Sequence, residues 1–292
     1  MARTLCTRSL CSTLRWVVLA AATSLWSVTA WPMGLPDTST LADDLYALRV
    51  EAGALVGAVA VIGLRDWNWG SSPEFRIRHE GWFGSDTESG GMDKLGHAYS
   101  AYLLTNGLTE RLVEQGRTAE SAARSAALLT QGLLLGVELF DGYSTRYGFS
   151  TEDLSMNLLG SAWAVLRQST PKLRERIDFR LAYQPSGYHG WSPLGDYAGH
   201  SYLMALKLSG FEATRRSPLR YLELHLGYRA RGFSPEELSD GRTRSRQGFA
   251  GVGINLSELL WGPATAADSR LRRNGRLLLE HLQWPGGAWY PP

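Results

Sequence analysis

Apolar residues recur at helical spacing over three consecutive segments in the middle of this chain. The segments span residues 92–115, 119–140 and 150–168, and Gly142 and Gly148 punctuate the loop between the last two. Apolar positions that recur every three to four residues share one face of an α-helix and pack against a neighbour. The pattern therefore predicts a bundle of amphipathic helices.

A further helix is predicted upstream, over residues 41–64, with helix-capping residues just before it. Its second half, residues 52–64, is apolar on every side, which is typical of a helix in the centre of a core or inside a membrane. This half is shorter than the roughly 20 residues needed to span a bilayer. Residues 65–91 are rich in glycine and aromatic residues and hold too many turn formers for a long helix, so they predict a structured loop.

After Pro171 the pattern changes to an alternation of apolar and polar residues, which predicts β-strands. The alternation is clearest over residues 222–228 and 250–256, and residues 200–209 offer a third candidate strand. The arginine-rich loop at 232–246 could join two of these strands. Three or four strands predict a small antiparallel sheet packed on or beside the helices.

The first thirty residues have the layout of a secretory signal peptide. Arg3, Arg8 and Arg15 precede an apolar run over residues 16–26, and a Val-Thr-Ala sequence favours cleavage after Ala30. The alternative is an uncleaved membrane anchor. Both place the rest of the chain outside the cytoplasm, in the periplasm or cell envelope, where it could associate with the membrane.

These patterns together predict a fold of the α+β class, in which a helical bundle core is followed by a small antiparallel β-sheet region. The predicted regions are a signal peptide (1–30), a linker (31–40), a helical domain (41–170) and a β-rich C-terminal region (171–292).

Composition narrows the classes of partner. The chain has 30 basic and 28 acidic residues, a net charge of +2, so no basic footprint for nucleic acid is present and no nucleic-acid partner is expected. Eleven tryptophans and twelve tyrosines suit membrane interfaces and sugar-binding clefts as well as cores, which favours membrane or cell-wall material as the partner. Cys6 and Cys11 precede the apolar run, so cleavage leaves a chain without thiols, disulfides or a cysteine for lipid attachment.

Each of the three central helices carries two polar residues at helical spacing. Residues three or four apart share one helix face. The flanking residues are apolar, so these faces are predicted to turn inward, where a carboxylate or amide needs a partner. We therefore expect three faces to converge on one site. The pairs are Asp93 with His97, Glu138 with Asp141, and Asp153 with Asn157.

Proton transfer is the chemistry that this set of residues favours. Buried acids beside a histidine are where pKa values move toward a useful range. His97 with Asp93 or Glu138 is the predicted general acid/base pair, and Asp153 is the fourth predicted catalytic residue.

A second group is predicted to bind substrate. Lys94 is conspicuous because the other basic residues are arginines except Lys172 and Lys207, and its ammonium could hold an anion or neutralise the acids. The predicted substrate-binding residues are Lys94, Asp141, Ser150 and Asn157.

Each of these residues also has a structural interpretation. Ser150 precedes Asp153 by three residues, as the cap of a helix start does, and Asp93 suits the first turn of a helix. His97 could be a buried core histidine, and Glu138 could pair with an arginine such as Arg146. The sequence leaves these alternatives open.

A metal site is the rival use of the same residues. Oxygen ligands with one histidine would suit a hard ion such as magnesium, manganese or calcium. Zinc is less expected, because its sites usually use several nitrogen or sulfur ligands. The bound ion, if any, and the cofactor stay unknown at this level.

The spaced pairs resemble the signature of the YfiM-like family, bacterial proteins predicted to be periplasmic or in the outer envelope and uncharacterised in function. The resemblance covers roughly residues 60–230, including Glu80-Gly81-Trp82-Phe83. The chain departs from the family's lipoprotein character by lacking the lipidated cysteine. The motifs that carry the resemblance are Asp93-Lys94-x-x-His97, Glu138-x-x-Asp141-Gly142 and Phe149-Ser150-x-x-Asp153-x-x-x-Asn157-x-x-Gly160.

A looser similarity is to VanZ-like membrane proteins, associated with glycopeptide resistance, in which the same elements occur in the same order. This similarity implies a shared helical core. The chain differs from them by shorter apolar runs and a long C-terminal tail.

Two functions are therefore expected as alternatives. The first is an envelope hydrolase or transferase that acts on lipid or cell-wall material through the Asp/Lys/His/Glu cluster. The second is a non-catalytic envelope protein whose polar cluster locks helix packing. Whether the chain is an enzyme is left open by the sequence.

Overall fold

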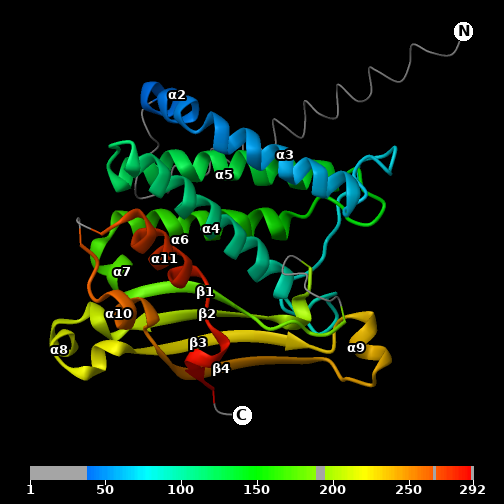
Figure 1. Ribbon diagram of the computed structural model, residues 1–292. Helices are drawn as coiled ribbons and strands as arrows, with labels where there is room; N and C mark the ends of the chain where they lie inside the picture. The colour runs from blue at the N-terminus through cyan, green and yellow to red at the C-terminus, as the bar shows by residue number, and fades with distance from the viewer. Residues whose placement is uncertain (1–37, 189–194, 266–267, 291–292) are drawn as a thin grey trace, which may run out of the picture. The chain divides into compact units, whose positions relative to one another are not determined.

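The computed structural model describes residues 38–188, 195–265 and 268–290 (Figure 1). The predicted signal peptide and most of the predicted linker lie outside these residues. Residues 41–292 form one compact unit. Within it, a helical region precedes a five-stranded antiparallel sheet, so the predicted α+β class is confirmed.

Three long helices form the centre of the helical region, within two residues of the predicted bounds. They are α4 (Met92–Glu114), α5 (Ala119–Asp141) and α6 (Thr151–Ser169). The side chains of Thr118 and Ser150 accept hydrogen bonds from backbone N–H groups in the first turns of α5 and α6. Such caps satisfy donors that have no partner inside the helix, and they determine where each helix begins.

The predicted upstream helix is two helices, α2 (Thr38–Ala47) and α3 (Arg49–Arg65), bent by 64° at the break between them. The buried carboxylate of Asp44, near this break, is held by Arg117 at 2.7 Å and by the Ser125 hydroxyl at 2.6 Å. These bonds tie α2 to the loop before α5 and to α5 itself.

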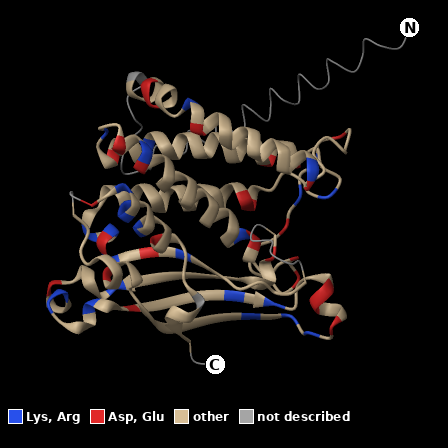
Figure 2. Cartoon of the chain, in the orientation of Figure 1, with Lys and Arg blue, Asp and Glu red and all other residues tan. Residues whose placement is uncertain are grey.

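Helix α3 has almost no charged residues between its ends (Figure 2). Leu55 and Val59 pack toward α4 and α5, whereas Val61 and Leu64 are exposed to solvent, so α3 is not the core helix that its composition allowed. Among the described helices none is both long and apolar enough to cross a bilayer by itself, and α2 and α3 pass that test only when taken as one bent pair.

The sheet has the strand order β1-β2-β3-β4-β5, and all neighbours are antiparallel. The three predicted strands are present, and the loop at 232–246 joins β3 to β4 through a short helix, α9 (Pro235–Ser239). Residues 177–183 were missed by the prediction although they alternate in the same way. The strands are β1 (Ile177–Tyr183), β2 (His200–Lys207), β3 (Leu222–Arg231), β4 (Ser245–Ile254) and β5 (Ala288–Trp289).

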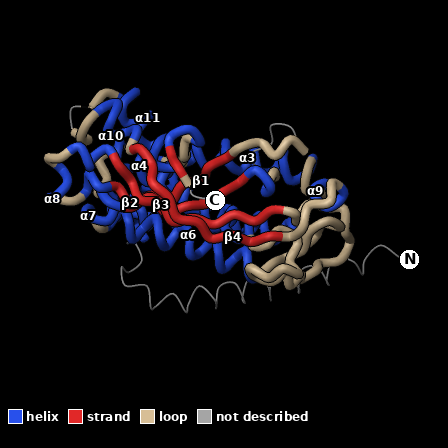
Figure 3. The backbone as a smooth tube through the Cα atoms, turned by 90° about the horizontal axis from the view of Figure 1, so that it is seen from below, coloured by secondary structure: helices blue, strands red, loops and turns tan. Residues whose placement is uncertain are grey.

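Shorter helices connect and flank the strands. Figure 3 shows the strands from the side away from α4 and α6. The remaining α-helices are α7 (Pro171–Arg176), α8 (Glu212–Arg215), α10 (Leu256–Trp261) and α11 (Arg270–His281).

The helices cover only part of one sheet face. Phe179 of β1 and Tyr202 of β2 pack against Tyr99 and Met156 in the main core. On the same face, farther along the sheet, Leu226 of β3 is 68% exposed. The alternation of apolar and polar residues predicted the strands, but the apolar face of β3 and β4 is partly exposed to solvent.

The opposite alternating positions of the sheet carry a buried network of charges. Asp178 accepts hydrogen bonds from Arg167 at 2.7 Å and from Lys207 at 2.8 Å, and Arg180 bridges Asp178 to Glu223. Removing one member would leave the others buried and unpaired, which is costly. The network therefore ties α6 to β1, β2 and β3.

Glu280 of α11 joins this network by accepting a hydrogen bond from Arg167 at 2.8 Å, and its titration predicts acid sensitivity. Burial alone would raise the pKa of Glu280, but Arg167 and Lys207 outweigh it and lower the pKa to about 2. A depressed pKa stabilises the fold above the unfolded value, about 4.3 for Glu, and this stabilisation is lost as the pH falls toward 2. We expect the unfolding temperature to fall between pH 4.5 and 2.5, and to fall less steeply in Glu280→Gln. Thermal unfolding followed by circular dichroism measures this, with the exposed Glu175→Gln as control; equal slopes in all three proteins would contradict it.

Candidate functional site

The start of α4 positions three of the predicted residues. Gly91 precedes the helix with a φ of 88°, and an added Cβ there would overlap the ring of Phe83, so glycine suits both the turn and the packing. The first two turns then present Asp93, Lys94 and His97 toward the loop before α4 and toward α5 and α6.

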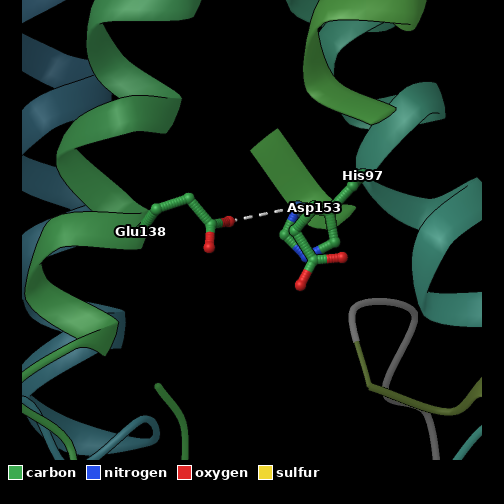
Figure 4. A group of neighbouring side chains, drawn as sticks. All are labelled: His97, Glu138 and Asp153. Atoms are coloured by element: carbon green, nitrogen blue, oxygen red, sulfur yellow. Dashed lines mark ion pairs between the residues drawn. The ribbon is translucent and has the colours of Figure 1, made fainter. Parts of the chain in front are cut away.

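His97 lies between two buried carboxylates from two other helices (Figure 4). Its Nδ1 is 3.6 Å from Glu138 Oε1 on α5, and its Nε2 is 3.7 Å from Asp153 Oδ1 on α6. Nδ1 is also 3.3 Å from Asn157 Oδ1. The His97 side chain is 26% exposed, whereas that of Glu138 is 2% exposed. The imidazole is thus the part of the cluster that solvent or a substrate reaches.

Lys94 lies at the centre of a second, adjoining group of acids. Its Nζ is 2.7 Å from Glu80, 2.7 Å from Asp153 and 2.9 Å from Asp93. The Lys94 side chain is 1% exposed. The ammonium donates hydrogen bonds to Glu80 and Asp153 and forms an ion pair with Asp93, and Asp153 belongs to both groups.

The remaining predicted residues surround these two groups. Glu138 Oε2 accepts a hydrogen bond from the backbone N–H of Ser150 at 3.3 Å, and the Ser150 hydroxyl accepts one from the N–H of Asp153. Asp141 accepts a hydrogen bond from Trp69 Nε1 at 2.7 Å. Glu138 forms no ion pair with Arg146 among the described contacts.

The structure thus brings His97, Glu138, Asp153 and Asn157 together, and it joins Asp93 to them through Lys94. Glu80 is the main residue that the sequence analysis missed as part of the site. It lies in a loop, where helical spacing gives no signal, and its one signal was its place in a segment that carries the family resemblance.

Burial and neighbouring charges move the pKa values of these acids in different directions. Burial, with the charges of Asp153 and Asp141, raises the pKa of Glu138 well above its usual range. Burial would also raise the pKa of Asp153, but His97 and Lys94 outweigh it and lower that pKa. His97 therefore separates a carboxyl that favours its proton from one that favours its charge.

The second group shows the same balance. Burial raises the pKa of Glu80 to about 7, although its bond to Lys94 opposes this shift. Burial also raises the pKa of Asp141, which does not contact Lys94, to about 7. Burial alone would lower the pKa of Lys94, but Asp93 and Asp153 outweigh it, so that pKa lies above its usual value and the ammonium stays charged.

Among the residues that the structure describes, two groups of three side chains could hold a metal ion. They are His97 with Glu138 and Asp153, and Glu80 with Asp93 and Asp153, and within each group the ligand atoms lie within 4.8 Å of one another. The Lys94 ammonium already contacts all three acids of the second group. The first group is therefore the candidate for an ion, through His97 and Glu138, which form no ion pair with Lys94 among the described contacts.

An apolar groove of about 620 Å³ runs between α6 and the sheet. Leu159 and Trp163 of α6 form one wall, and Leu226 and Tyr228 of β3 form the other. Leu95 of α4, which lies between Lys94 and His97 in sequence, also lines the groove. The groove is the hollow part of the sheet face that the helices leave open.

Comparison with known families supports the expected location. Residues 79–169 match the model of a family described as predicted periplasmic lipoprotein (DUF2279). The matched range contains the whole candidate site, from Glu80 through the end of α6. No curated protein and no solved structure matches the chain. The match supports a location in the periplasm or cell envelope, and the more specific YfiM-like and VanZ-like resemblances stay predictions.

Proposed function

We propose that this protein is a cell-envelope hydrolase or transferase that acts on lipid or cell-wall material, with His97, Glu138 and Asp153 at the reacting centre. The observation that carries the proposal is the position of His97. Its imidazole is partly exposed, and a buried carboxyl group lies near each ring nitrogen: Glu138 is 3.6 Å from Nδ1, and Asp153 is 3.7 Å from Nε2. Carboxyl groups that orient an imidazole suit it for proton transfer to or from a bound substrate.

The other residues have supporting roles in this proposal. Asp153 and Glu138 orient His97, and the amide oxygen of Asn157 can accept a hydrogen bond from Nδ1. Lys94 is enclosed by three acids, so we assign it the role of holding Asp153 and Asp93 in place rather than of contacting substrate. A hydrolase of this design would use water as the nucleophile.

The groove supports a lipid rather than a polar substrate. Its volume of about 620 Å³ falls in the range of small-molecule sites, and its walls are apolar side chains. Leu95, which lines the groove, precedes His97 by two residues on α4, so the groove lies close to the helix turn that carries His97. A hydrocarbon chain in the groove would leave its polar end free to reach that turn.

A second candidate function is favoured by the enclosure of Lys94. An ammonium with 1% exposure and three carboxylate partners is a complete buried network, and such networks specify unique packing. In this alternative the cluster locks α4, α6 and the preceding loop together, and the protein is a non-catalytic envelope component.

Replacement of His97 separates the two candidates. We expect His97→Ala to remove the protein's ability to complement a deletion strain, because proton transfer is lost, while its unfolding temperature and abundance stay close to those of the wild type. The matched control is His79→Ala, since His79 is an exposed histidine 3.8 Å from Glu152. Full complementation by His97→Ala would overturn the catalytic proposal, and loss of folding in that variant would favour the structural alternative.

A further inference from the structure

The distances around His97 Nδ1 suit atoms that share an ion better than atoms that share a proton. Nδ1 is 3.6 Å from Glu138 Oε1 and 3.3 Å from Asn157 Oδ1. A good N–H···O hydrogen bond measures about 2.7–3.2 Å. Two ligand atoms that each lie about 2.1 Å from the same cation are roughly 3.0–3.4 Å from each other.

Glu138 provides a second, independent observation. Its Oε1 is buried and has no hydrogen-bond partner among the residues that the structure describes, although Oε2 accepts a bond from the Ser150 N–H. Figure 4 shows this carboxylate facing the His97 ring. A buried polar atom without a partner is costly unless something binds it, so this oxygen points to a ligand at the Nδ1 side.

The local charge balance points to a cation. In the described part of the chain, the ion pairs that reach the acids of the site come from Lys94 and His97, and Lys94 already contacts three carboxylates. Asp141 and Glu138 are left without a full positive charge. The acids concerned are Glu80, Asp93, Glu138, Asp141 and Asp153.

We infer that His97 Nδ1, Glu138 Oε1 and Asn157 Oδ1 bind one divalent cation of the oxygen-preferring class, for which Mn²⁺ is the probe of choice because it also accepts imidazole. In this arrangement Nε2–H of His97 faces Asp153, and Lys94 holds that carboxylate. An outer carboxylate on the second ring nitrogen is the usual way in which a metal-bound histidine is oriented.

This inference rests on the proposed function, because it refines how the same centre would act. With a cation bound, His97 is a ligand, and water on the cation takes over as the activated nucleophile. The His97 side chain is 26% exposed. That water and the substrate would approach from its exposed side.

Binding of Mn²⁺ to the full chain, stripped with a chelator, tests the inference by isothermal titration and electron paramagnetic resonance. We expect one equivalent to bind, and we expect His97→Ala and Glu138→Gln each to weaken binding by at least about tenfold. Asn157→Asp replaces an amide ligand by a carboxylate and is expected to tighten binding. The control is Glu110→Gln. Glu110 lies on α4, as His97 does, but pairs with Arg174, so this variant should bind Mn²⁺ as the wild type does.

Absence of binding of Mn²⁺, Mg²⁺, Ca²⁺ and Zn²⁺ by the folded wild type would overturn the inference, as would a Glu138→Gln protein that binds like the wild type. The outcomes separate the two proposals. If no cation binds but His97→Ala fails to complement, the cation inference falls and proton transfer by His97 stands. If Mn²⁺ binds through these residues and His97→Ala still complements, the site is a cation site and the catalytic proposal falls.

Discussion

Replacement of Lys94 by methionine is expected to lower the free energy of unfolding by about 3–5 kcal/mol at pH 7, because it leaves buried carboxylates without their counterion. Glu80 and Asp153 each lie 2.7 Å from Nζ, and Asp93 lies at 2.9 Å. Methionine fills a similar volume, so the loss reports charge rather than a cavity. Urea denaturation of the variant and the wild type measures the difference.

The pH dependence of the Lys94→Met effect provides an internal check. In the variant the acids can relieve their repulsion only by binding protons, so the deficit should shrink as the pH falls from 7 to 5. The control is Lys172→Met, since Lys172 is exposed on α7 and should change stability little. A Lys94→Met protein as stable as this control would show that the enclosure of the ammonium does not hold the site together.

Replacement of Gly160 by alanine is expected to destabilise the fold by about 3 kcal/mol, because one methyl group forces two helices apart. An ideal Cβ on Gly160 would overlap the backbone carbonyl of Ala98, so no change of rotamer can relieve the clash. Helix α6 would have to move away from α4, and Asp153 and Asn157 would move with it. Thermal and urea unfolding measure the loss, and Mn²⁺ titration measures the effect on the site.

A second glycine-to-alanine change provides the matched control. Gly132 lies in the exposed part of α5, with nothing within 4 Å of an added Cβ. Because alanine favours helix by up to about 1 kcal/mol over glycine, Gly132→Ala should be neutral or stabilising. Equal effects of the two substitutions would mean that α4 and α6 do not meet at Gly160 as described.

The helix bounds could be predicted because their causes are local. Ser150 lies at the start of α6 and its hydroxyl caps the helix, and the apolar residues that follow recur at helical spacing. The meeting of the His97, Glu138 and Asn157 faces was expected for the same reason, since apolar flanks drive each face inward. The break after Ala47 could not be predicted, because the bonds of Asp44 near this break are made to residues more than seventy positions away.

The sheet shows a limit of a different kind. Alternation in residues 222–228 predicted a strand but could not say which side would be covered, since both sides of β3 carry residues that can be buried. Glu223 is buried among charges and Leu226 is 68% exposed, the reverse of what hydrophobicity alone suggests. The apolar side of β3 is exposed because the helices that pack on β1 and β2 do not extend over Leu226.

The sequence by itself determined the fold class, the three central helices and the set of polar residues that face inward, because periodicity and capping act within a few residues along the chain. Only the tertiary structure decided that Lys94 is shared by three acids, that Glu80 joins them from a loop, that Asp141 turns to Trp69, and that one oxygen of Glu138 is left facing His97. These contacts depend on the distance and angle between helices, which are set by packing such as that of Gly160 against Ala98.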